Sequence, residues 1–174
     1  MTPSASPASI DSSTRIRDEE TISARIIAVA IKDERAKEAL LKHLDQYPDM
    51  QSCKLVMLHI VRPQWLETEP HSGVGGQRMM IEHRDQLVFA SAILEDLKHA
   101  LKAKYPLLKI EYRIKSGDVF KLLPHLVESI DADRLLIFKN NNRGIPRLGK
   151  SLEQKLSERC SCPVDQVTIN TPKK

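Results

Sequence analysis

Apolar segments of strand length alternate along this chain with segments of helical periodicity, and this alternation constrains the fold more than any other feature. The runs ARIIAVAI (24–31), KLVMLHIV (54–61) and RLLIF (134–138) are almost entirely apolar. Such runs are typical of strands buried on both faces of a parallel sheet. The alternation therefore predicts an α/β fold built from βαβ units, with helices on both faces of the sheet.

Two further strands complete the predicted sheet. In LKIEYRIK (108–115) apolar and charged residues alternate, which predicts one solvated face and a place at a sheet edge. VDQVTI (164–169) is a short last strand. Because the more apolar first and fourth strands belong at the centre, the pattern predicts a Rossmann-like five-stranded parallel sheet of order 3-2-1-4-5. Ligands of such sheets bind beyond the carboxyl ends of the strands, here between the first and fourth.

The longest predicted helix runs from Glu82 to Lys104, where leucines and alanines recur at three and four residues and Pro106 forbids much extension. The stretch 62–81 before it contains three glycines and is longer than most connections. It is therefore predicted to be a functional or mobile loop, such as a lid.

Two helices are predicted in the second half of the chain. Gly117 and Asp118 should start a helix that runs to about Ile130, with a kink at Pro124. Residues 150–160 form the last predicted helix, and Ser151 is its expected N-cap.

The 174 residues fit one domain, with an ordinary globular composition of 41% hydrophobic and 29% charged residues. Residues 1–22 are rich in Ser, Thr and Pro and are predicted to be a disordered tail. Residues 23–170 would form the domain, and 171–174 a C-terminal tail. The chain lacks both an apolar run of roughly 18 residues and a secretory signal pattern. Together with an odd number of cysteines, three, this predicts a cytoplasmic protein without membrane insertion.

Composition also limits the classes of ligand and partner. The formal net charge is +4, but aromatic residues make up only 4% and the lysines are scattered, so no nucleic-acid partner is expected. No second Cys/His pair has metal-ligand spacing relative to Cys160 and Cys162, so no metal site is predicted. His59 lies within a buried strand and is interpreted as a core histidine with its hydrogen bonds satisfied, not as a catalyst.

The stretch GIPRLGKS (144–151) matches the P-loop pattern G-x-x-x-x-G-K-[ST]. In a P-loop the first glycine follows its strand almost directly, whereas here five residues separate Phe138 from Gly144. Only a short polar strand follows, so no aspartate could reach Mg²⁺ in the usual manner. A P-loop ATPase is therefore the least favoured interpretation.

Four stretches together resemble the universal stress protein family over about residues 24–169. They are RIIAVAIKDERAKEAL (25–40), LVMLHIV (55–61), SGDVFKLLPHLVESIDADRLLIF (116–138) and GKSLEQKLSERCSCPVDQVTI (149–169). Their order and spacing carry the resemblance, because each stretch alone is weak. The resemblance implies a stress-response or regulatory module that acts through protein contacts, and not an enzyme.

Many members of that family bind ATP through G-x2-G-x9-G-[ST] and an aspartate that ends the first strand. In this sequence the aspartate position is Ile31, the first two glycine positions are Lys139 and Asn142, and the last pair is Lys150-Ser151. The chain thus resembles a divergent member that keeps only the hydroxyl. It is not expected to bind ATP in the usual family manner.

A site for another anion is the alternative. Asparagines tolerate left-handed backbone, basic residues would surround the crevice, and the last helix would point its N-terminus there. A sensor of a nucleotide or another anionic ligand would use residues from both flanking segments. The candidate ligand-binding residues are Lys32, Asp33, Lys139, Asn140, Asn142, Arg143, Gly144, Gly149, Lys150 and Ser151.

The resemblance also implies a homodimer formed by pairing of the last strands. Asp165 and Gln166 stand where the family leads one to expect apolar residues. Since charges on an edge strand discourage pairing, this interface is in question.

Overall fold

A computed structural model describes residues 24–63, 74–140 and 151–169, which form one five-stranded parallel sheet in the order β3-β2-β1-β4-β5. The predicted order is confirmed. The strands are β1 (Ile26–Ala30), β2 (Lys54–Val61), β3 (Lys109–Ser116), β4 (Arg134–Asn140) and β5 (Val164–Ile169). The helices are α1 (Ala36–Leu44), α2 (Val74–Lys104), α3 (Val119–Ser129) and α4 (Leu152–Ser157), with a 3-10 turn, η1, at Met50–Ser52.

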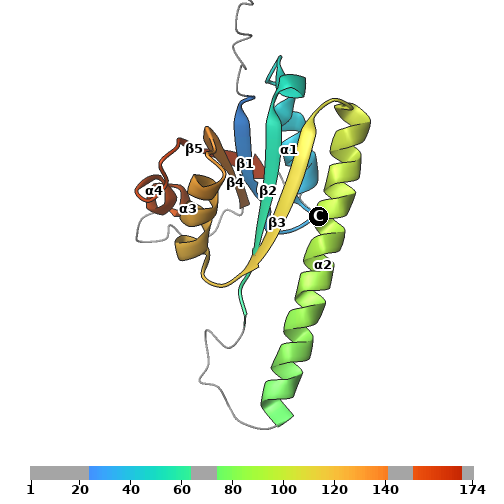
Figure 1. Cartoon of the computed structure of the whole chain (residues 1–174), viewed down its shortest axis with the longest axis vertical. Helices are drawn as coiled ribbons and strands as arrows, with labels where there is room; N and C mark the ends of the chain where they lie inside the picture. Colours follow the sequence, from blue (N-terminus) through green and yellow to red (C-terminus); the bar gives the residue numbers. More distant parts are fainter. Residues whose placement is uncertain (1–23, 64–73, 141–150, 170–174) are drawn as a thin grey trace, which may run out of the picture.

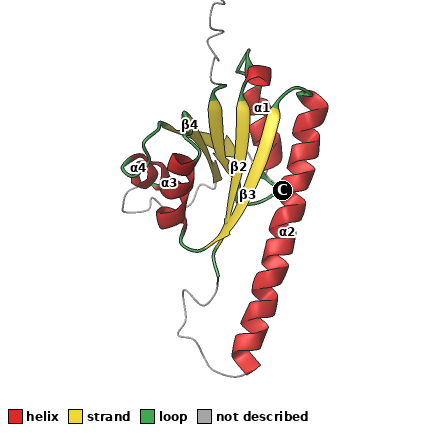
Figure 2. Cartoon of the chain, in the orientation of Figure 1, coloured by secondary structure: helices red, strands yellow, loops and turns green. Residues whose placement is uncertain are grey.

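Helices cover both faces of the sheet (Figure 2). One core cluster joins α1 and α2 to alternate residues of the sheet, including Ile27, Val29 and Leu55. The second joins α3 and α4 to the residues between them, such as Ala28 and Val56. Each central strand is therefore buried on both faces, which explains why its sequence is continuously apolar.

The two edge strands carry polar side chains that find partners within the chain. On β3, Glu111 pairs with Lys54 at 2.7 Å, and Tyr112 donates a hydrogen bond to Glu95 of α2. On β5, Asp165 accepts a hydrogen bond from Arg134 of β4. The alternating third strand lies at an edge, as its pattern predicted.

Asp133 joins the first and fourth strands at their amino ends. Its carboxylate accepts a hydrogen bond from the Ile26 backbone N–H at 2.7 Å, and its own N–H donates to the Ile26 carbonyl at 2.9 Å. These contacts precede the register in which Ile27 lies opposite Arg134.

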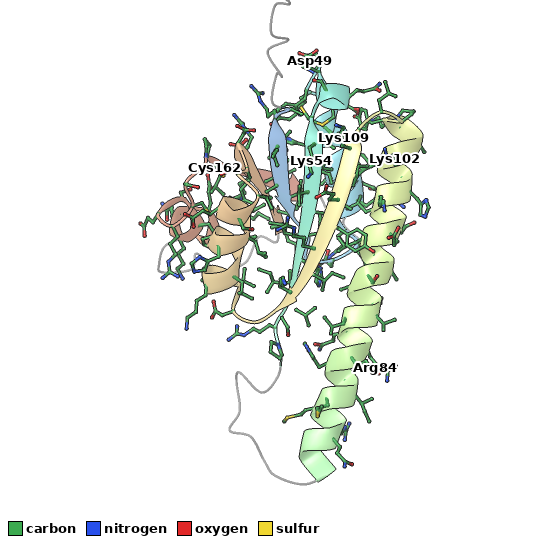
Figure 3. All side chains as sticks on the ribbon, in the orientation of Figure 1. Asp49, Lys54, Arg84, Lys102, Lys109 and Cys162 are labelled. Atoms are coloured by element: carbon green, nitrogen blue, oxygen red, sulfur yellow. The ribbon has the colours of Figure 1, made fainter. Side chains whose placement is uncertain are left out.

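Helix α2 begins earlier than predicted. The sequence suggested a loop over 62–81, but residues 74–81 are helical, and α2 is 31 residues long. Its first half extends past the carboxyl ends of the strands (Figure 1), and Arg84 lies on this part (Figure 3). The prediction was wrong because two glycines in the first turn suggested a loop, whereas an Arg78–Glu82 ion pair at 2.9 Å supports the helix.

The helices of the second half begin as predicted. Asp118 caps α3 by accepting a hydrogen bond from the Lys121 N–H at 3.1 Å, and Pro124 lies inside the helix. Gly117 has a φ of 149°, which side chains rarely adopt, so glycine is required at this turn. Helix α4 is shorter than predicted: it ends at Ser157, whereas the sequence predicts a helix to residue 160.

Among the described residues, no helix is long and apolar enough to cross a membrane. The three cysteines are free: Cys53 is buried, and Cys160 and Cys162 are half-buried.

Candidate functional site

The carboxyl ends of the central strands form the wall of a cavity of about 520 Å³. The chain leaves β1 toward α1 on one face, whereas α4 follows β4 on the other, so the crevice lies at the switch point of the sheet. Residues from β1, β2, β4, α2, α3 and α4 line it. This is the place where the sequence predicted a ligand site.

Lys32 lines the cavity, as predicted. Asp33 does not, because it turns to Arg35, with 2.5 Å between its Oδ2 and the guanidinium. The hydrogen bond from Arg35 lowers the pKa of Asp33 and keeps the carboxylate charged. Asp33 instead borders a smaller cavity of about 230 Å³ between α1 and α2, and its role in ligand binding stays a prediction.

Lys139 and Asn140 are the last two residues of β4 and lie opposite Thr168 and Ile169 of β5. Neither is among the described residues that line the cavity. The strand presents Ile137 and Phe138 there instead. The cavity thus borders the end of this strand, and the ligand-binding role of Lys139 and Asn140 stays a prediction.

The candidates Asn142, Arg143, Gly144, Gly149 and Lys150 lie outside the described residues, and so does most of the P-loop match. Ser151 is described, and it caps α4 as predicted. Its hydroxyl accepts a hydrogen bond from the Gln154 N–H at 3.2 Å, while the Gln154 side chain accepts from the Ser151 N–H at 2.9 Å. This capping box occupies the hydroxyl in a structural role.

Ile31, at the position where the resemblance implies an aspartate, is only 3% exposed and lines the cavity. Its N–H donates to the Leu58 carbonyl at 2.8 Å, which continues the β1–β2 ladder. An apolar side chain thus occupies the position from which a carboxylate would accept hydrogen bonds from a ligand.

His59 is a core residue, as predicted, but not all of its ring nitrogens have a hydrogen-bond partner. The residue is 9% exposed and lines the cavity, and its Nδ1 has no hydrogen-bond partner among the described residues. Burial lowers the pKa of His59, and the neighbouring Ile31 backbone and Asp33 only partly oppose that effect. The ring is therefore neutral near pH 7, and its unpaired Nδ1 is buried and does not face the cavity.

The aromatic residues of the site were not predicted from the sequence. Phe89, Phe120 and Phe138 all line the cavity, although they come from α2, α3 and β4. The available signal was their position: Phe120 lies in the first turn of a helix, and Phe138 lies near the carboxyl end of a central strand. No group of three His, Cys, Asp or Glu side chains within the described part of the chain is placed to hold a metal ion.

No family model and no curated protein matches the sequence. Solved structures do match the fold. The universal stress protein UspA from Lactobacillus plantarum has a TM-score of 0.62 at 12% identity, over 83% of this chain and 99% of that one. A universal stress protein family member from Burkholderia pseudomallei has a TM-score of 0.56 at 19% identity, over 82% and 94%.

A third structure is a universal stress protein family protein from Arabidopsis thaliana with AMP bound. Its TM-score is 0.55 at 19% identity, and the match covers 84% of this chain and 93% of that one. At these identities the matches show the fold alone. The chain has the universal stress protein fold, and the resemblance drawn from its sequence is confirmed at that level.

Proposed function

We propose that the chain is a universal stress protein-like regulatory module of the cytoplasm, which acts through contacts with other proteins and is not an enzyme. It does not bind ATP in the usual family manner. The observation that carries this proposal is the buried Ile31 at the cavity wall, where the resemblance implies an aspartate. A buried isoleucine offers no hydrogen bond to ribose or base, so a polar ligand group placed there would be left unpaired.

A sensor of a nucleotide or another anion is the second candidate. Lys32 lines the cavity and Lys139 lies exposed at the end of β4, so positive charge is present at this edge of the sheet. The fold is shared with the Arabidopsis thaliana structure that contains AMP. A P-loop ATPase is the weakest candidate, because five residues separate Phe138 from Gly144, whereas the first glycine of a P-loop follows its strand almost directly.

A homodimer remains part of the proposal, with pairing of β5 as the interface in question. β5 is an edge strand of the described sheet. Its Asp165 forms an ion pair with Arg134 of the same chain. This ion pair compensates the negative charge that would otherwise discourage pairing at the sheet edge.

The test is calorimetric titration of ATP, ADP and AMP, with and without Mg²⁺, into protein that was stripped by unfolding and refolding. We expect no binding in the micromolar range. Micromolar ATP binding that is lost in Lys32→Ala or Lys150→Ala would overturn the proposal in favour of the anion sensor. Lys109→Ala is the matched control, because Lys109 is exposed at the opposite end of the strands (Figure 3).

A further inference from the structure

The cavity at the carboxyl edge is lined almost entirely by apolar side chains. Fourteen of its eighteen described lining residues are apolar. All three phenylalanines of the chain are among them, although the chain is poor in aromatic residues. Phe89 is 63% exposed, and Phe120 and Phe138 are half-buried. Phe138 and Phe120 pack partly against the core clusters on opposite faces of the sheet, and both residues, like Phe89, also border the open volume, which suits another apolar group.

His59 also lines the cavity, but its unpaired Nδ1 is itself buried and does not face the open volume. A ligand in the cavity therefore meets an apolar wall here and not an accessible ring nitrogen.

The charged residues that line the cavity are both basic. They are Lys32, which follows β1, and Arg62, which follows β2, and no acidic side chain is found among the described lining residues. Lys32 is exposed, so its ammonium group can remain hydrated until it meets a ligand. This distribution favours a ligand with a negative charge at one end.

We propose that the cavity binds a small amphiphilic acid, with an aromatic or aliphatic body among Phe89, Phe120 and Phe138. The acidic group would lie toward Lys32. The volume of about 520 Å³ falls within the roughly 300–1,000 Å³ typical of small-molecule sites. This inference rests on the proposed function in one respect, namely that the site does not hold ATP.

The first test is fluorescence titration of the full chain with anilinonaphthalene sulfonate, which combines aromatic rings with an acidic group. We expect saturable binding, with a dissociation constant raised about tenfold by Phe120→Ala or Phe138→Ala. Leu107→Ala is the control, because Leu107 is 75% exposed and lies outside the cavity. Absence of saturable binding, or equal weakening in all three variants, would overturn the proposal.

The second test asks whether the site prefers an acid. Octanoate should displace the probe at a concentration at least tenfold lower than octylamine does. Lys32→Gln should reduce that preference severalfold, whereas Lys109→Gln should leave it unchanged. Equal displacement by acid and amine would overturn the assignment of an acidic ligand.

Calorimetry with ATP on the same samples separates this inference from the proposed function. Probe binding without ATP binding supports both. Micromolar ATP binding that displaces the probe would overturn the proposed function and the acid together. Absence of both probe and ATP binding would overturn the inference alone and leave the proposed function standing.

Discussion

The two halves of α2 carry similar apolar side chains but lie in opposite surroundings. In the second half, Ala90, Leu94, Leu97 and Leu101 are at most 2% exposed and face the sheet. In the first half, no residue from 77 to 89 is buried, and Met80, Ile81, Val88 and Phe89 are 61–69% exposed. An apolar helix face becomes part of the core only where a sheet lies opposite. Beyond the strands, the same kind of face borders a cavity or solvent.

The largest difference between the two halves is expected when Leu94→Ala is compared with Val88→Ala. Leu94 is fully buried, so its truncation should lower the free energy of unfolding by about 2–5 kcal/mol. Val88 is 64% exposed, and its truncation should change that free energy by less than about 0.5 kcal/mol. Urea unfolding of the two variants and the wild type measures both values. Equal losses would show that the first half of α2 is packed in solution.

Protonation of His59 provides a second probe of the cavity wall. Because burial lowers the pKa of His59 in the folded state, the unfolded chain takes up a proton more readily. The contribution of a neutral His59 to the free energy of unfolding should therefore be complete above a pH of about 6.5, the ordinary pKa of histidine. It should decrease as the pH falls below that value. Urea unfolding between pH 5 and pH 8 tests this sign.

The matched variant for that experiment is His59→Gln, which does not titrate. Its stability should decrease less on acidification than that of the wild type. His43, whose pKa is also lowered by burial, should account for part of the remaining slope. An unchanged slope in His59→Gln would contradict burial of a neutral His59.

The sheet could be predicted from sequence because strand burial is a local property. Continuous apolarity in β1 and β4 and alternation in β3 reflect the number of covered faces, and this fixed which strands were central. The caps at Asp118 and Ser151 were equally local, since each side chain bonds to a backbone group three residues on.

The site could be predicted only in part, because its walls come from six elements. The place of the cavity at the carboxyl edge, and Lys32 in its lining, could be predicted from the sheet topology. The presence of three phenylalanines in the same lining depends on how α2 and α3 pack. Asp33 was assigned to the site because of its position after β1, but an arginine two residues further on binds its carboxylate. The start of α2 was not predicted, because its first turns contain glycines and exposed apolar residues and therefore lack the periodic buried face of a helix.

A smaller effect is expected at the contact that attaches the first half of α2 to the sheet. His83 Nε2 and the Ser116 hydroxyl lie 2.9 Å apart, which links α2 to the end of β3. Ser116→Ala should cost about 0.5–1.5 kcal/mol locally. Hydrogen exchange should show faster exchange over 77–89 and unchanged exchange over 90–104. Uniform acceleration over both halves would contradict their independence.

The smallest effect is expected at the exposed Arg78–Glu82 pair, four residues apart on the first half of α2. Glu82→Gln should cost about 0.3–0.5 kcal/mol of local helix stability at low salt, and less at high salt. The helicity of a peptide spanning 74–104, followed by circular dichroism against salt concentration, measures it. A salt-independent loss would show that Glu82 acts through another contact.

Stability and ligand binding can be compared in one variant, Phe89→Ala. The apolar residues at the carboxyl edge are expected to serve a ligand, whereas those on the second half of α2 stabilise the fold. Phe89→Ala should change the free energy of unfolding by less than about 0.5 kcal/mol and raise the dissociation constant of anilinonaphthalene sulfonate about tenfold. A loss of several kcal/mol with unchanged probe affinity would make Phe89 a core residue and would contradict this division of roles.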